Sequence, residues 1–367
     1  MFALNANACS ILAGLEERNL ADAAPGPTAD GTMDPRDAAA ADSSVADAGP
    51  AESGQTRSTV AVAGGADEFG GSVTEVYSAA LDANGDLRDW MSGPSLPMGK
   101  AFAGSFAMGR TWYLAAGLIA STSSTAETST FWSTVAEDGR SLSAWAVGQP
   151  FPTAISRFAL AQTVNFAFVS GGFDGARALA SVYMAPLGGS RMGSFVAGRP
   201  LPEARARASA AATSTHLFVM GGDNEGVGVL PVLSARIGLQ GDLDPWVTVG
   251  MLPEPRSLGC AVAVADVVYF IGGETVQRAR SDRVWRFRTK PDGSITIDEM
   301  PALQGPRSLH SCVAANGVVH VLGGRPDTAG ATTSTSSSRI DASGALGPWQ
   351  SSKPLPAPRQ LLLVHAF

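Results

Sequence analysis

The sequence predicts an all-β protein that closes into a ring of six four-stranded antiparallel sheets, and three observations predict it. One short pattern recurs six times, about every 50 to 55 residues, from about residue 57 to the last residue, 367. In each copy a hydrophobic run ends with a glycine pair. A bulky residue follows further along the chain, and a proline stands seven positions after it. Four short strands can be read in each copy. A period of this length is typical of sheets repeated around an axis.

The recurring positions are regular along the chain. The glycine pairs and one degenerate member are Gly64-Gly65, Ala116-Gly117, Gly171-Gly172, Gly221-Gly222, Gly272-Gly273 and Gly323-Gly324. The bulky positions are Trp90, Trp145, Phe195, Trp246, Ile297 and Trp349. The positions seven residues later are Pro97, Pro152, Pro202, Pro253, Gln304 and Pro356.

The fifth copy shows the four strands, here called A to D in chain order. They are predicted over Leu258–Val264, Val267–Ile271, Arg283–Thr289 and Ile295–Glu299. Turn residues that favour positive φ separate strands C and D in every copy. These turns are Asn84-Gly85, Asp138-Gly139, Gly188-Gly189, Gln240-Gly241, Pro291-Asp292-Gly293 and Ser343-Gly344. No helical periodicity stands out in the repeats.

The two ends of the repeat region predict how the ring closes. The first copy begins at a strand B, and the chain ends with a strand A, because Phe367 aligns with Val264. We therefore expect Leu361–Phe367 to pair with Ser58–Ala63 and to complete a sheet that both ends share. This pairing removes edges that would otherwise be open to other chains.

The first 56 residues differ in composition from the repeats. They hold nine of the 33 acidic residues and two of the 26 basic ones, so the formal charge of −7 belongs to them. Residues 21–56 are rich in Ala, Asp, Pro, Gly and Ser and contain no aromatic residue, which predicts disorder. We expect a disordered segment or stalk over 1–56 and one propeller domain over 57–367. The neutral repeats argue against a nucleic-acid surface.

The three cysteines predict no disulfide framework. In the aligned copies Cys260 and Cys312 are one residue out of register, on opposite strand faces. We expect two buried thiols there. No run is long and apolar enough to cross a membrane, and the N-terminus lacks the basic start of a secretory signal. Leu4–Cys9 is faintly similar to a lipoprotein cleavage site, so we expect a protein of the cell envelope or exterior.

The glycine pairs, the spaced aromatics and one further module together resemble the kelch-repeat family over about residues 57–367. That module runs Trp–Leu/Phe-Pro–Arg, as in WVTVGMLPEPR and WQSSKPLPAPR. Departures from the family pattern are Ala116, Ile297 and Lys100. The resemblance implies a six-bladed β-propeller. It also implies that the face carrying the B–C and D–A loops binds ligands, because peptide-binding kelch domains use that face.

A basic residue near each proline is the most regular polar feature. These six candidate ligand-binding residues are Lys100, Arg157, Arg205, Arg256, Arg307 and Arg359. They lie in the D–A connections, where they are expected near the central channel and could bind a carboxylate, a phosphate or an acidic peptide. Acids that follow the glycine pairs could neutralise them instead: Asp67, Asp174, Asp223, Glu274 and Asp327. Both interpretations stay open from sequence.

Other chemistry finds little support in the sequence. No Tyr-His pair of the kind that copper radical oxidases use is present, and the four histidines fall at unmatched positions, so no metal or cofactor is expected. Asp82–Asp86 is similar to a calcium loop but lacks its distal acid, so we expect a hairpin turn. The repeated aromatic positions are expected to pack sheet against sheet.

The sequence favours a non-catalytic module that binds a protein or a glycan through the B–C/D–A face. The alternative is a carbohydrate enzyme, because bacterial six-bladed kelch propellers include sialic-acid epimerases. Such an enzyme needs an acid–base pair beside a carboxylate-binding arginine, and Glu203 and Glu254 are the acids to suspect. A structural spacer is a third possibility.

Overall fold

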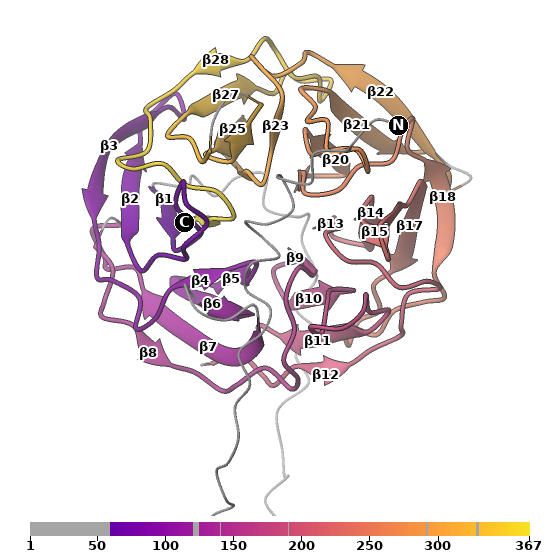
Figure 1. Ribbon diagram of the computed structural model, residues 1–367, viewed down its shortest axis with the longest axis horizontal. Coiled ribbons are helices and arrows are strands. Elements are labelled where there is room, and N and C mark those ends of the chain that lie inside the picture. The colour runs from indigo at the N-terminus through magenta and orange to yellow at the C-terminus, as the bar shows by residue number, and fades with distance from the viewer. Residues whose placement is uncertain (1–58, 120–124, 140, 190, 291–292, 328–329) are drawn as a thin grey trace, which may run out of the picture.

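The computed structural model describes residues 59–119, 125–139, 141–189, 191–290, 293–327 and 330–367. These residues form a six-bladed β-propeller, with each blade a four-stranded antiparallel sheet, as predicted (Figure 1). The A strands lie nearest the axis and the D strands lie at the rim. The disorder expected over 1–56 falls outside the described residues.

Blades 1 to 3 occupy the first half of the ring, and each is built in the order A to D from the axis outward. Blade 1 consists of β29 (Leu363–Ala366), β1 (Thr59–Ala63), β2 (Val76–Leu81) and β3 (Leu87–Ser92). Blade 2 consists of β5 (Gly104–Met108), β6 (Thr111–Ile119), β7 (Ala126–Thr134) and β8 (Ala146–Val147), with β4 (Lys100–Ala101) also paired to β6. Blade 3 consists of β9 (Ala159–Gln162), β10 (Phe166–Ser170), β11 (Val182–Pro186) and β12 (Val196–Ala197).

Blades 4 to 6 complete the ring. Blade 4 consists of β13 (Ser209–Ala212), β14 (His216–Met220), β17 (Pro231–Arg236) and β18 (Val247–Met251). Blade 5 consists of β19 (Cys260–Val264), β20 (Val267–Ile271), β21 (Val284–Thr289) and β22 (Ile295–Met300), close to the predicted bounds. Blade 6 consists of β24 (Ser311–Ala315), β25 (Val318–Leu322), β27 (Thr335–Arg339) and β28 (Gln350–Ser351). Two short pairs lie outside the blades: β15 (Asp223–Asn224) with β16 (Val227–Gly228), and β23 (Arg307–Ser308) with β26 (Arg325–Pro326).

The predicted closure of the ring is confirmed. β29 pairs antiparallel with β1, and Val62 lies opposite Val364 in the register. Blade 1 therefore contains both ends of the propeller, as the C label beside β1 indicates in Figure 1. Ser58, the first residue of the expected pairing, lies outside the described residues.

The core is divided into six apolar clusters, one between each pair of neighbouring blades. The residue before each repeated proline, or before Gln304, is buried in these layers: Leu96, Phe151, Leu201, Leu252, Leu303 and Leu355. The strand D tryptophans also link blades. Trp349 Nε1 donates to Pro301 O of blade 5 at 2.9 Å, and Trp145 Nε1 donates to Pro94 O of blade 1 at 2.9 Å. The expected packing role of these aromatics is confirmed.

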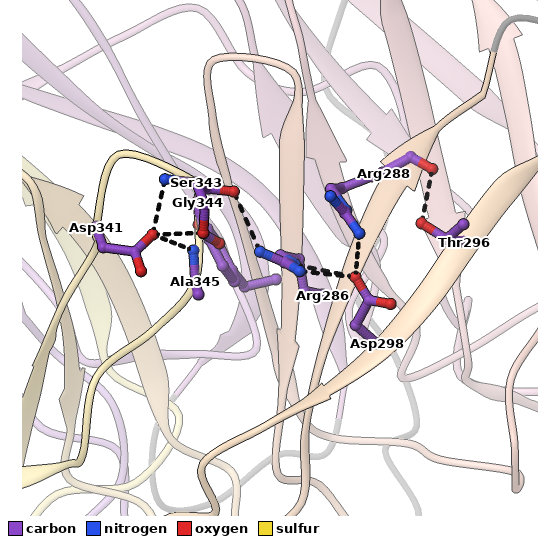
Figure 2. A network of polar contacts seen from close by, with 9 residues as sticks. Arg286, Arg288, Thr296, Asp298, Asp341, Ser343, Gly344 and Ala345 are labelled. Carbon is purple, nitrogen blue, oxygen red and sulfur yellow. Dashed lines mark hydrogen bonds and ion pairs between the residues drawn. The ribbon is translucent and has the colours of Figure 1, made fainter.

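The C–D turns provide a second kind of contact between blades. In blade 6 the Asp341 carboxylate accepts the backbone N–H groups of Ser343 and Ala345, which fixes the turn. Arg286 of blade 5 donates Nη1 to Ser343 O at 3.2 Å and is held by Asp298 at 2.8 Å (Figure 2). Asp82 accepts the N–H groups of Asn84 and Asp86 in the same way, so this segment is the hairpin turn expected.

The expectation of two free thiols is wrong. Cys260 on β19 and Cys312 on β24 form a disulfide, with their Cα atoms 5.9 Å apart. Neighbouring blades present opposite faces of their sheets to each other. Residues of opposite strand parity therefore meet at the interface, and the offset of one residue brings the two sulfur atoms together. The disulfide joins the inner strands of blades 5 and 6.

Candidate functional site

Five of the six predicted basic residues are buried beneath the B–C/D–A face: Lys100, Arg205, Arg256, Arg307 and Arg359. Their side chains run toward strand C of their own blade. Arg205 Nη1 donates to Pro231 O at the start of β17 at 2.8 Å, and Arg307 Nη2 donates to Ser334 Oγ at 2.9 Å. Burial lowers the pKa of Lys100, Arg205, Arg256 and Arg307 from the ordinary values.

Four of these cations have carboxylate partners other than the acids expected. The pairs are Lys100 with Glu127, Arg205 with Glu203 at 2.8 Å, Arg256 with Glu254, and Arg359 with Glu75 at 3.2 Å. Glu203 and Glu254, the acids suspected of catalysis, are thus bound to buried arginines. These pairs cross-link the D–A connection and hold the cations away from the channel.

The backbone of the same positions explains why they recur with the glycine pairs. The second glycine of each pair donates its N–H to the carbonyl oxygen of the corresponding residue in the next blade. Gly222 donates to Arg256 O at 2.7 Å, and Gly324 donates to Arg359 O at 2.7 Å. The glycines have positive φ, and a Cβ on Gly64 would lie 2.7 Å from Lys100 O. A Cβ there crowds the neighbouring blade, although Ala116, with a φ of 54°, occupies the equivalent position in blade 2.

The five predicted acids have other roles in the described part of the chain. Asp67 accepts the N–H groups of Phe69 and Gly71, and Asp174 caps its own loop beside Arg177. Asp327 lies 3.2 Å from Arg280. The other two bind within the site region: Glu274 accepts a hydrogen bond from Ser308 Oγ at 3.0 Å, and Asp223 binds Arg207.

Arg157 does not occupy the position that sequence alignment gave it. The N–H of Gly117 in blade 2 donates to Ile155 O, at the start of blade 3, at 2.9 Å. Ile155 is therefore the equivalent of Arg205 and Arg256. Arg157 stands two residues further on and is equivalent to Arg207. Counting three residues from each repeated proline would have identified Ile155, because Lys100 and Arg205 both lie at that spacing.

The position two residues beyond each basic position forms a circle around the channel mouth, here called the mouth ring. Its members are Phe102, Arg157, Arg207, Leu258, Leu309 and Leu361. All six have φ between 51° and 58°, a region that non-glycine residues rarely adopt. The N–H of one member donates to the carbonyl oxygen of the preceding member, as in Arg207 N to Arg157 O at 2.8 Å and Leu361 N to Leu309 O at 2.7 Å. Five of these six links are formed, and blades 1 and 2 flank the remaining position.

Two arginines give the mouth ring its charge. Arg207 donates Nε and Nη2 to the two carboxylate oxygens of Asp223 at 2.7 and 2.5 Å. The Arg157 guanidinium lies over two aromatic rings, 5.4 Å from the Phe102 centroid and 4.8 Å from the Phe173 centroid. Burial, with a smaller contribution from repulsion by Arg207, lowers the pKa of Arg157. In the described residues no carboxylate forms an ion pair with Arg157.

The mouth ring encloses a cavity of about 140 Å³. His310 lines the cavity. The Nε2 atom of His310 lies 3.1 Å from Ile271 O, and this carbonyl oxygen can only accept a hydrogen bond. Burial lowers the pKa of His310 to about 3, so the imidazole of His310 is neutral at pH 7. A larger cavity of about 390 Å³, lined by His216, Arg236 and Thr289, lies at the opposite face and contains none of the predicted site residues.

The B–C loops surround this mouth, because their first residues pair with the D–A connections, as in Phe173 with Ser156. They carry the large apolar side chains of Phe69, Val227 and Val276, which face solvent, and Ile119 at the end of β6 is also exposed. Phe69 is 81% exposed and Val227 is 70% exposed. These apolar side chains are therefore exposed on the same face as the mouth cavity.

The chain matches no protein-family model, and it matches no curated protein. Among solved structures it is similar to one described as the structure of YjhT, with a TM-score of 0.61 and 14% sequence identity. The similarity covers 83% of this chain and 99% of that one. At this identity the likeness supports the β-propeller fold alone.

Two further observations concern the described residues as a whole. They contain no group of three or more His, Cys, Asp and Glu side chains that could hold a metal ion. No helix among them has the length and apolarity needed to cross a membrane.

Proposed function

We propose that this propeller is a non-catalytic, kelch-like binding module that takes a carboxylate group of a protein or a glycan into the channel mouth on its B–C/D–A face. The observation that carries the proposal is the Arg157 guanidinium. It lies over two aromatic rings and forms no ion pair with a carboxylate among the described residues. Stacking covers the faces of a guanidinium and leaves its N–H donors, which lie in the plane, available for a carboxylate.

The size of the cavity favours binding over catalysis. Sites that enclose a small-molecule substrate are typically about 300 to 1,000 Å³. The mouth cavity, of about 140 Å³, holds one chemical group of a larger ligand whose remainder lies outside. The exposed apolar residues of the B–C loops, such as Phe69 and Val227, offer contacts to that remainder.

The disulfide between Cys260 and Cys312 supports a location in the cell envelope or outside the cell. Disulfides persist in oxidising compartments and are rare in the cytosol. A surface that meets proteins or glycans in such a compartment fits a recognition role.

The proposal is tested by measuring thermal shifts with carboxylate ligands and their neutral counterparts. Acidic peptides and sialylated oligosaccharides are compared with amidated peptides and with asialo oligosaccharides. We expect at least one carboxylate ligand to stabilise the wild-type protein and to lose its effect with Arg157→Ala. Arg177→Ala is the matched control, because Arg177 lies on the same face and is 77% exposed outside the mouth. Equal shifts with the Arg157→Ala variant would rule the site out.

A second candidate function is the interconversion of carboxylate sugars, as in the sialic-acid epimerases. The observation in its favour is that His310 lines the same cavity as Arg157 and Arg207. Its low pKa and its bond to Ile271 O make it a weak base. Proton NMR of a sialic acid incubated with the protein tests this function. Acceleration of the interconversion by wild type, lost with His310→Gln, would favour the enzyme.

A further inference from the structure

The mouth ring is divided into a charged part and an apolar part. Arg157 and Arg207 come from blades 3 and 4, whereas Leu258, Leu309 and Leu361 come from blades 5, 6 and 1. Backbone hydrogen bonds link these residues around the axis, so the two arginine positions lie opposite leucine positions of the mouth ring. A ligand that fills this space needs a negative charge on one side and an apolar group on the other.

The charge available for the ligand is close to one unit. Asp223 accepts two hydrogen bonds from Arg207 and neutralises it, and His310 is uncharged at neutral pH. Asp223 also attracts Arg157 but forms no ion pair with it, so the group of two arginines and one carboxylate keeps one positive charge. One positive charge matches one carboxylate better than it matches a doubly charged phosphate.

The apolar part is accessible from the same space. Leu258, Leu309 and Leu361 are half-buried and line the cavity beside the arginines. Burying the apolar area that they leave exposed stabilises a complex, because that area is removed from water. The cavity volume of about 140 Å³ limits the inserted part of the ligand to about one residue.

We propose that the mouth ring binds the C-terminal residue of a polypeptide whose last side chain is aliphatic or aromatic. This inference rests on the proposed function and names its ligand class. A terminal residue carries a carboxylate and a side chain on the same Cα, so one residue reaches both Arg157 and the three leucines. Capture of a terminal carboxylate is a known mode of peptide recognition. The preceding residues of the peptide lie over the B–C loops, against side chains such as Phe69 and Val227.

The first experiment measures binding of N-terminally labelled peptides to the full-length protein by fluorescence anisotropy. The probes are a set of ten-residue peptides of varied sequence that end in Leu, Phe or Val. Each is made with a free carboxylate and as the C-terminal amide. We expect amidation to weaken binding by at least about tenfold, because it removes the charged acceptor of the hydrogen bonds from Arg157. Replacing the last residue with Ser is expected to weaken binding by a similar factor.

Variants of the mouth ring provide the second experiment. Arg157→Ala should weaken binding of the free-acid peptide by about tenfold or more and leave binding of the amide unchanged. Leu309→Ser should weaken both forms. Arg177→Ala, the matched control on the same face, should change neither. Urea midpoints and circular dichroism of each variant show whether the fold is kept, and Arg157→Lys separates loss of charge from loss of the bidentate geometry.

The outcomes separate this inference from the proposed function. Equal binding of acid and amide peptides, or binding that Arg157→Ala leaves unchanged, overturns the inference. The inference is also overturned if sialylated glycans or internal acidic segments bind through Arg157 and terminal peptides do not, but in that case the proposed function stands. If no carboxylate ligand of any kind binds through Arg157, both are overturned.

Discussion

Gly222 of blade 4 donates its backbone N–H to the carbonyl oxygen of Arg256 in blade 5 at 2.7 Å. The same bond recurs at every blade interface and explains why the glycine pair of one blade recurs together with the position three residues after the repeated proline, or after Gln304, in the next. The repeat that is most visible in the sequence therefore records contacts between blades. The candidate site lies two residues further along, at positions that the repeat leaves free to vary.

The Gly222→Ala variant should lower the free energy of unfolding by about 2 kcal/mol or more, because its φ is +87° and a Cβ would lie 2.7 Å from Ala206 O. Gly175→Ala is the matched control: its φ is +103° and no atom lies within 4 Å of a Cβ. It should cost only about 1 kcal/mol. Urea unfolding followed by tryptophan fluorescence measures both. Equal losses would mean that the close approach of Gly222 to Ala206 is unimportant.

Arg205→Ala should destabilise the protein by about 2 kcal/mol or more, because the side chain is fully buried and bonded to Pro231 O. Arg157→Ala should change stability by less than about 1 kcal/mol, since Arg157 has no ion pair in the described chain. The comparison of urea midpoints distinguishes a structural arginine from one available for a ligand. A reversed order would contradict the assignment of Arg157 to the site.

Reduction of the Cys260–Cys312 disulfide should lower the free energy of unfolding by about 2 to 4 kcal/mol, since it closes a loop with a sequence separation of 52. The measurement is the urea midpoint with and without dithiothreitol. In the Cys260→Ser/Cys312→Ser double variant the reductant should have no effect. A wild-type urea midpoint that is the same with and without dithiothreitol would contradict the presence of the disulfide.

Acidification should destabilise the fold below about pH 6.5. Burial lowers the pKa of His320 to about 4 and that of His310 to about 3, so the unfolded chain binds these protons first. Their contribution is complete above the ordinary value of 6.5 and falls as the pH drops toward 4, by at most about 1.4 kcal/mol per pH unit for each group. Urea unfolding between pH 7 and pH 4.5 checks this slope, which His320→Leu should make shallower. An unchanged slope in that variant would exclude His320 as a source.

Much of the fold was predictable because one local pattern repeats and each copy tests the others. The strands of blade 5 and the pairing of β29 with β1 follow from alignment alone. The disulfide was missed because strand parity within a single sheet says nothing about how two successive sheets face each other. Arg157 was misaligned because an arginine happens to stand near Ile155, whose apolar side chain breaks the basic pattern.

The mouth ring was harder to find because its members share a backbone conformation and little chemistry. Phe102, Arg207 and Leu361 have no common side-chain property, so a search for repeated residue types passes over them. Their spacing of five residues from each repeated proline, or from Gln304, was the available indication. Differences among equivalent positions carried more functional information than the positions that repeat.

Because β29 supplies the inner strand of blade 1, the propeller cannot close during synthesis until residues 363–366 leave the ribosome. A nascent or trimmed chain that ends before Leu363 presents the bare side of β1 to its surroundings. Such an unpaired edge can pair with a strand from another molecule. Carboxy-terminal trimming would therefore convert a self-contained ring into a species that recruits other molecules, including further copies of itself.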